Sequence, residues 1–191
     1  DLSTPRVMGI INVTPDSFYG KSRYSEAEEI INAASGMMDE GACFVDIGGY
    51  SSRPGAEDVS PDEERKRVMN AVRLVSRELP EVIISIDTFR SEIAREAVLE
   101  YGAGMINDIS GGDADPAMFS TVGKLKVPYV MMHMQGTPGT MQRNPFYEDV
   151  VADILKWFGD RIYRLTTMGV SDIILDPGIG FGKTADHNFE I

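Results

Sequence analysis

Short apolar runs alternate with stretches of helical periodicity six times along the chain, and this alternation limits the possible folds more than any other feature. The apolar runs occupy positions 6–13, 43–47, 82–86, 105–109, 128–132 and 172–175. Each is followed by a stretch in which apolar residues recur at helical spacing, as Ile30, Ile31 and Ala34 do. Strict strand–helix alternation predicts a parallel sheet, either an open doubly wound sheet or a closed barrel.

Capping residues predict where the helices begin and end. Ser25 with Glu28 has the pattern of a capping box, and Ser60-Pro61 has the pattern of a helix start. Gly102 and Gly169 are placed to end helices, and the stretch 147–168 is the longest helix expected. Further helix starts are expected at residues 115–116 and after Thr184.

The length of the repeating unit favours a barrel. Residues 6–191 hold six units of about 31 residues each, and eight such units approach the ~250 residues of a (β/α)₈ TIM barrel. On this interpretation residues 1–191 form a single, C-terminally incomplete domain with six of the eight βα units. The first and sixth strands would then be unpaired edges, so the chain is expected to be either a fragment of a barrel or an open sheet.

Composition narrows the functional classes. Thirty acidic residues against 18 basic ones give a net charge of −12, which disfavours nucleic acid as a partner. No apolar run reaches the ~18–20 residues that span a bilayer, and the first residues lack the pattern of a signal peptide. We therefore expect a cytoplasmic protein with no membrane partner. The single cysteine, Cys43, excludes an internal disulfide and is expected in the core.

Polar residues gather where the predicted strands end. They are Asn12, Asp46, Asp87, Asn107, Asp108, His133 and Asp176. The carboxyl ends of parallel strands carry the active sites of α/β proteins. Any one of these residues could instead cap a helix, but their presence at all six strands favours a shared cleft. Carboxylates and amides suit a flat ligand with several N–H donors, whereas His133 is expected to be structural.

Two glycine-rich segments follow predicted strands. Residues 178–184 resemble a phosphate-binding loop but lack the Walker spacing, so nucleotide hydrolysis is disfavoured. The segment is interpreted as a permissive strand-to-helix turn that lets the backbone approach a flat ligand beside Phe181. The second segment, 46–55, is long and polar, as expected of a lid or an anion-binding loop.

Taken in order, these motifs resemble the dihydropteroate synthase family, the folate-pathway targets of sulfonamides. The matching segments are 12–18, 46–55, 85–88, 107–111, 132–136 with 141–142, and 176–183. The resemblance implies a TIM barrel that joins 4-aminobenzoate to (7,8-dihydropterin-6-yl)methyl diphosphate and releases pyrophosphate, with Mg²⁺. It further implies a homodimer in the full-length form.

The resemblance also implies roles for individual residues. Asp87, Asn107 and Asp176 would hold the pterin, and the negative charges of Asp87 and Asp176 would favour the cation left by early C–O cleavage. Met132 and Phe181 would line that pocket, and Asn12 would lie on the Mg²⁺ and pyrophosphate side. The residues implied to close over aminobenzoate are Asp16, Phe18, Ser52, Arg53 and Pro54. Lys183 is a further candidate for substrate binding.

The sequence departs from the family pattern in three places. Ser52 stands where threonine is usual, and residues 19–23 replace the usual Asp-Gly-Gly. The Ser-Arg-Lys and Arg-x-His motifs of strands 7 and 8 have no counterpart, so the chain alone is expected to be inactive or part of a longer enzyme.

Two rival interpretations remain. One is the pterin-binding domain of a corrinoid methyltransferase, which does not need segment 46–55. The other is a non-catalytic pterin-binding homologue, which the missing strands favour but which would not need Asn12, Arg53 or Lys183.

Overall fold

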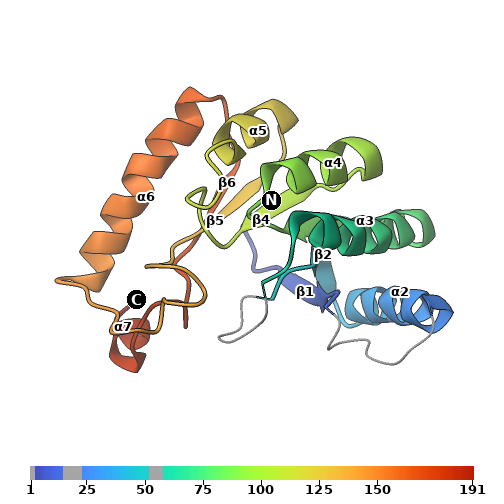
Figure 1. The fold of residues 1–191 in the computed structure, drawn as a ribbon, viewed down its shortest axis with the longest axis horizontal. Helices are drawn as coiled ribbons and strands as arrows, with labels where there is room; N and C mark the ends of the chain where they lie inside the picture. Colours follow the sequence, from blue (N-terminus) through green and yellow to red (C-terminus); the bar gives the residue numbers. More distant parts are fainter. Residues whose placement is uncertain (1–2, 15–22, 52–57) are drawn as a thin grey trace.

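The computed structural model describes residues 3–14, 23–51 and 58–191, with the side chains of residues 23–25 not described. Strands and helices alternate through the described chain (Figure 1). In order they are β1 (Val7–Asn12), α2 (Arg23–Asp39), β2 (Ala42–Gly48), α3 (Pro61–Glu78), β3 (Ile83–Asp87), α4 (Ser91–Tyr101), β4 (Met105–Asp108), α5 (Met118–Leu125), β5 (Tyr129–Met132), α6 (Val150–Thr167), β6 (Ile173–Asp176) and α7 (Ala185–Glu190).

The six strands form one parallel sheet whose spatial order follows the chain, from β1 to β6. A doubly wound sheet reverses its strand order at a switch point and carries helices on both faces, and neither feature is present in the described residues. Instead, α2 to α6 follow one another in an arc around one side of the sheet (Figure 1). The sheet is therefore an arc of six strands of a TIM-type barrel, which confirms the barrel interpretation.

Strand register separates the sheet into two chemically different faces. Residues paired across parallel strands share a face, and the face alternates at every residue. The outer face carries the main hydrophobic core, because Ile47, Ile86 and Ile106 are fully buried against the helices. The inner face carries Asp46, Asp87 and Asn107 at the carboxyl ends of the strands. The fold thus turns the polar residues away from the helices and into the barrel interior.

Most helix ends follow the predicted capping residues. The Ser60 hydroxyl accepts a hydrogen bond from the Glu63 N–H ahead of α3, and Gly102 follows α4 with φ +74°. Thr184 and His187 form a capping box at α7. Helix α6 begins at Val150, three residues later than expected, because the Asp149 side chain caps it.

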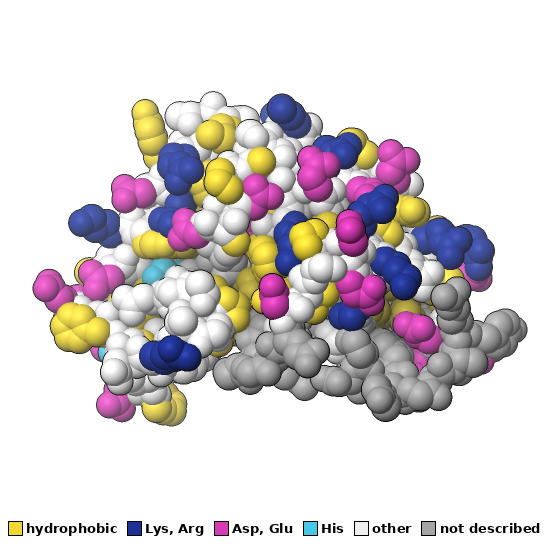
Figure 2. All heavy atoms as spheres, in the orientation of Figure 1, with side chains coloured by type: hydrophobic (Ala, Val, Ile, Leu, Met, Phe, Trp, Pro, Cys, Tyr) yellow, Lys and Arg dark blue, Asp and Glu magenta, His cyan; other side chains and the backbone are white. Residues whose placement is uncertain are grey.

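The surface is mixed in charge. Acidic and basic side chains are interspersed over the helices on the face shown in Figure 2. Within residues 3–14, 23–51 and 58–191, no helix combines the length and the apolar character needed to cross a membrane. Cys43, expected in the core, is only half-buried, with the Arg6 Nη1 3.9 Å from its Sγ. It lies in β2 at the point where the register with β1 shifts.

Candidate active site

Three polar side chains meet on the inner face of β2, β3 and β4. The Asn107 amide donates a hydrogen bond to Asp46 Oδ2 at 2.9 Å. Asp87 lies level with Gly48 on one side and with Asn107 on the other. A Cβ atom at Gly48 would lie 2.9 Å from Asp87 Oδ2, so the carboxylate occupies the space that glycine leaves open. The structure therefore brings together Asp46, Asp87 and Asn107, three of the residues expected to share a cleft.

Asp176 faces the same interior from β6. It pairs with Met132, which is two positions beyond Val130, and Val130 pairs with Asn107. Asp176 is therefore on the inner face, one inward-facing step further along the strand direction than Asn107. Its Oδ1 accepts a hydrogen bond from the Gly178 N–H at 2.8 Å, which fixes the carboxylate at the start of the β6–α7 loop. Met132, predicted to line the pterin pocket, is buried on the same face.

The inner face carries several carboxylates and few hydrogen-bond donors to pair with them. Burial, followed by the negative charges of Asp46 and Asp108, raises the pKa of Asp87 well above its ordinary value. Burial also raises the pKa of Asp46, and the polar side chains of Ser85 and then Asn107 partly offset this increase. Asp46 Oδ1 is buried with no hydrogen-bond partner among the described residues. A ligand that brings N–H donors or positive charge to this face would therefore be favoured.

Asp108 does not belong to this cleft, which corrects the expectation that all the strand-end polar residues share it. It follows Asn107 in β4 and so faces the helices instead. Its carboxylate accepts hydrogen bonds from the Tyr129 hydroxyl at 2.7 Å, the Ser110 hydroxyl at 2.7 Å and the N–H groups of Ser110 and Gly112. Asp108 therefore holds the β4–α5 turn, and the alternation of faces explains why adjacent residues have different roles.

His133 and Lys183 form a buried pair between β5 and the β6–α7 loop. The Lys183 ammonium lies 3.1 Å from His133 Nδ1 and donates to the carbonyl oxygens of Gly178 and Phe181 at 3.0 and 2.9 Å. His133 packs edge-on against Trp157, with ring centroids 5.0 Å apart, in the structural role expected for it. Burial, then the neighbouring Lys183 charge, lowers the pKa of His133 to about 4. The ammonium predicted to bind substrate is thus engaged by the protein itself.

The β6–α7 loop is shaped by glycine. Gly178, Gly180 and Gly182 all have positive φ, a region that other residues rarely adopt. A Cβ atom at Gly178 would lie 2.1 Å from the carbonyl oxygen of His133, so this position also requires a close backbone approach. Phe181 is half-exposed in this loop.

The remaining predicted residues divide into two groups. Asn12 is exposed at the end of β1, level with Gly48, on the same inner face. The residues predicted to contact aminobenzoate lie outside the described part of the chain, and these are Asp16, Phe18, Ser52, Arg53 and Pro54.

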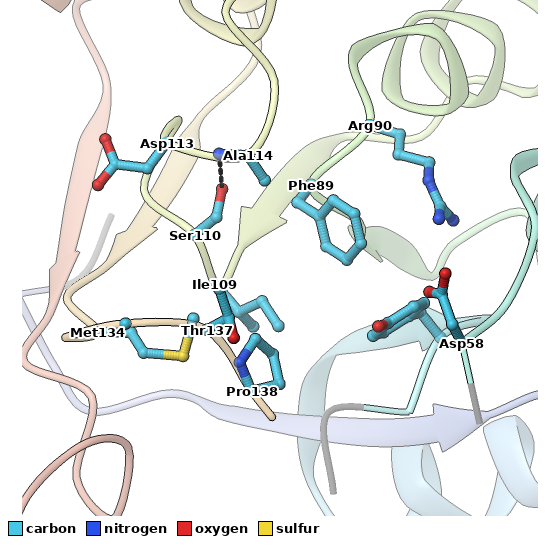
Figure 3. A pocket seen from close by; sticks show the side chains of 12 residues that line it. Asp58, Phe89, Arg90, Ile109, Ser110, Asp113, Ala114, Met134, Thr137 and Pro138 are labelled. Carbon is cyan, nitrogen blue, oxygen red and sulfur yellow. Dashed lines mark hydrogen bonds between the residues drawn. The ribbon is translucent and has the colours of Figure 1, made fainter. Parts of the chain in front are cut away.

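A cavity of about 330 Å³ lies at the ends of β2 to β5 (Figure 3). Phe89, Ile109 and Met134 line it, each two residues beyond an inner-face residue. Tyr50, Arg90 and Pro138 complete its wall. None of these lining residues was among those predicted for the site. The available signal was position, because Phe89, Ile109 and Met134 each stand two residues beyond an inward-facing strand residue, and a search for acceptors alone overlooks them.

Comparison with known proteins assigns the family. Residues 8–191 match the family described as pterin binding enzyme. The chain is 41% identical to dihydropteroate synthase of Escherichia coli K12 over 193 residues, covering all of this chain and 67% of that protein.

Solved structures agree with that assignment. A dihydropteroate synthase of Yersinia pestis in a sulfonamide complex matches with a TM-score of 0.90 at 40% identity, covering 100% of this chain and 69% of that one. The enzyme of Xanthomonas albilineans in complex with 7,8-dihydropteroate matches with a TM-score of 0.84 at 36% identity, covering 100% and 66%. The chain thus spans about two thirds of the length of these relatives. It belongs to the pterin binding enzyme family and, within it, to the dihydropteroate synthases.

Proposed function

We propose that this chain forms the pterin-binding side of an enzyme that joins 4-aminobenzoate to (7,8-dihydropterin-6-yl)methyl diphosphate, giving 7,8-dihydropteroate and pyrophosphate. The supporting observation is the group of acceptors on one inner face, Asp46, Asp87, Asn107 and Asp176. A pterin presents an amino group and ring N–H groups along one edge, which require acceptors of this kind. The relative that holds 7,8-dihydropteroate binds the product of this reaction.

Asp87 and Asp176 would act on the reacting centre by charge. Cleavage of the C–O bond to the diphosphate leaves positive charge on the methylene carbon, which the electron-rich pterin can spread. Fixed carboxylates favour that cation more than the neutral ground state, so they lower the barrier to cleavage. Asn107 is held by its hydrogen bond to Asp46, which orients the amide toward the ligand edge. The amine of 4-aminobenzoate then attacks the carbon, so no protein nucleophile is needed.

We also propose that Mg²⁺ takes part, with the protein supplying only a few of its ligands. The described residues contain no group of three or more His, Cys, Asp or Glu side chains that could hold a metal ion. Asn12 can supply one side-chain oxygen at the open end of β1, and Mg²⁺ commonly takes one or two protein ligands and completes its shell with phosphates and water. When bound, the ion would neutralise charge on the departing diphosphate. The residues present fit this arrangement and not an all-protein cage.

Other parts of the proposal rest on the resemblance. Asp16, Phe18, Ser52, Arg53 and Pro54 are proposed to contact 4-aminobenzoate, and sulfonamides are proposed to compete there because the Yersinia pestis relative binds one. Lys183 is proposed to act through the loop that it holds rather than through direct contact. A homodimer and a cytoplasmic location are proposed for the full-length protein.

The test is formation of 7,8-dihydropteroate by the full-length protein from the two substrates. Asp176→Asn should reduce turnover and pterin affinity, because it removes the charge but keeps the shape and one acceptor. Asp160→Asn, an exposed change on α6, is the matched control. Calorimetric titration with the pterin, with and without pyrophosphate and Mg²⁺, separates an enzyme from a non-catalytic binder, which would show no linkage among the three. Unchanged kinetics in Asp176→Asn would contradict the assigned role.

A further inference from the structure

Arg90 contacts both described ends of the segment that runs between Tyr50 and Val59. On the near side, its guanidinium carbon lies 5.6 Å from the centroid of the Tyr50 ring. On the far side, its Nη2 donates a hydrogen bond to the Val59 carbonyl oxygen at 2.7 Å. Phe89 joins the contact, with its ring edge-on to Tyr50 and its centroid 4.9 Å from Arg90. One side chain therefore ties together two points that are nine positions apart in the sequence.

Arg90 is itself held from beneath by Glu64. The Glu64 side chain is completely buried in α3, forms an ion pair with the Arg90 guanidinium and accepts a hydrogen bond from the Thr88 hydroxyl at 2.6 Å. The Thr88 oxygen also accepts from the Arg90 N–H at 3.2 Å. Two of the guanidinium nitrogens are thus directed in fixed and different directions, one toward Glu64 and one toward Val59.

The same turn carries Asp87. Thr88 follows Asp87 directly, and the Thr88 N–H donates to the carbonyl oxygen of Asn107 at 3.0 Å. The group formed by Glu64, Thr88 and Arg90 is therefore joined through one peptide to the acceptors on the inner face. It also forms part of the wall of the 330 Å³ cavity, through Tyr50, Phe89 and Arg90 (Figure 3).

We propose that Arg90, held by Glu64, is a positioning residue that fixes Tyr50 and Val59 relative to Asp87 and so sets where the second substrate meets the pterin. The proposal rests on the proposed function, and its geometric support is the cavity at the strand ends, whose wall includes Tyr50, Phe89 and Arg90 and which lies next to the turn that carries Asp87. Its effect should therefore fall on 4-aminobenzoate more than on the pterin.

A purely stabilising role is a poor explanation for this pair. A buried ion pair contributes little net stability compared with apolar residues of the same size, because both charges must leave water. Helices α3 and α4 are also already joined by a two-pronged ion pair between Arg65 and Glu96, at 2.5 and 2.7 Å. What Arg90 adds, and Arg65 does not, is contact with Tyr50 and Val59.

The test uses the full-length protein carrying Arg90→Met with Glu64→Gln. This double change removes both charges together, so no charge is left buried alone. The glutamine side-chain oxygen can still accept a hydrogen bond from the Thr88 hydroxyl. We expect the KM for 4-aminobenzoate to rise about tenfold or more, with pterin affinity within about twofold of wild type. Amide exchange at Tyr50, Ser51 and Val59 should become faster. Arg65→Met, which breaks the exposed ion pair between the same helices, should change neither quantity.

Arg90→Lys is the second variant and keeps the buried charge paired. A lysine can reach Glu64 or Val59 but cannot donate to both while lying over the two rings, so an intermediate rise in KM is expected. Wild-type exchange at Tyr50 and Val59 in both Arg90 variants would overturn the proposal, and so would an equal effect from Arg65→Met. Amide exchange measures how firmly Arg90 holds Tyr50 and Val59 even if the wild-type protein forms no dihydropteroate. Failure of this proposal can therefore be distinguished from failure of the proposed function.

Discussion

Replacing Lys183 with methionine should change how the stability of the protein depends on pH. Lys183 is only 4% exposed, and its ammonium is surrounded by His133 and by backbone carbonyl groups. Burial lowers the pKa of Lys183 from 10.5 to about 8, although the Asp176 carboxylate acts in the opposite direction. Methionine has a similar length and no charge, so the substitution removes the titration with little change in packing.

The magnitude follows from the two pKa values. Between pH 8 and 10.5 the unfolded chain holds a proton on this lysine that the folded chain has lost, so the free energy of unfolding rises with pH. The full difference corresponds to about 3 kcal/mol between those limits. Wild type should therefore gain about 3 kcal/mol relative to Lys183→Met as the pH rises from 8 to 10.5.

The assay is urea denaturation at a series of pH values, with the variant subtracted from wild type so that other titrating groups cancel. Lys156→Met, an exposed change on α6, is the control and should give a flat difference. The chain has only two histidines, so the ring signals of His133 can be followed by NMR against those of His187. Removing the Lys183 charge should raise the pKa of His133 from about 4. A pH-independent stability difference together with an unchanged His133 titration would refute the proposed pairing.

Two further substitutions test the inner face and the loop beside it. Asp87→Asn should raise the free energy of unfolding at neutral pH, because it removes a carboxyl whose pKa is raised by burial, yet should weaken binding of the pterin diphosphate about 10- to 100-fold. Denaturation measures the stability and calorimetry measures the pterin affinity. A variant in which both increase, or in which both decrease, would contradict the assignment. Gly178→Ala should destabilise the fold by about 2 kcal/mol or more, because φ is +70° and the new Cβ meets the His133 carbonyl, whereas Gly139→Ala meets nothing within 4 Å; equal denaturation midpoints would contradict this.

The sequence predicts the elements well because their signals are local. Strand β3 lies one residue from its predicted position, and helix α4 ends directly before Gly102 as predicted, since an apolar run and a terminal glycine mark them directly. The choice between an open sheet and a barrel is different in kind. It depends on the order in which strands pair, a long-range property that no short stretch of residues records. Unit length favoured the barrel, and the pairing from β1 to β6 decided it.

The sequence indicates which residue types gather at the strand ends, but it does not indicate which face of the sheet each side chain takes or which side chains the protein itself engages. Position at a strand end does not say which face a side chain takes, so Asn107 and Asp108 seemed equivalent although one faces the interior and the other the helices. Lys183 seemed available to a ligand because a sequence does not show which carbonyl groups a loop turns inward. Arg90 belongs to none of the motifs that the sequence analysis used for the site. Its contacts with Tyr50 and Val59 form only when the chain folds, so the sequence did not indicate them.

The inner face also explains why this site would bind its ligand with a gain in folding stability. Asp46 and Asp87 are placed so that burial raises the pKa of each, and the charge of Asp46 raises that of Asp87 further. Above the ordinary carboxyl pKa, the folded state without ligand therefore bears a cost that the unfolded chain does not. A ligand edge of N–H donors, and still more a cation formed during C–O cleavage, relieves this cost. On the proposed function, the feature that limits the stability of the protein without ligand would therefore also strengthen pterin binding and lower the barrier to C–O cleavage.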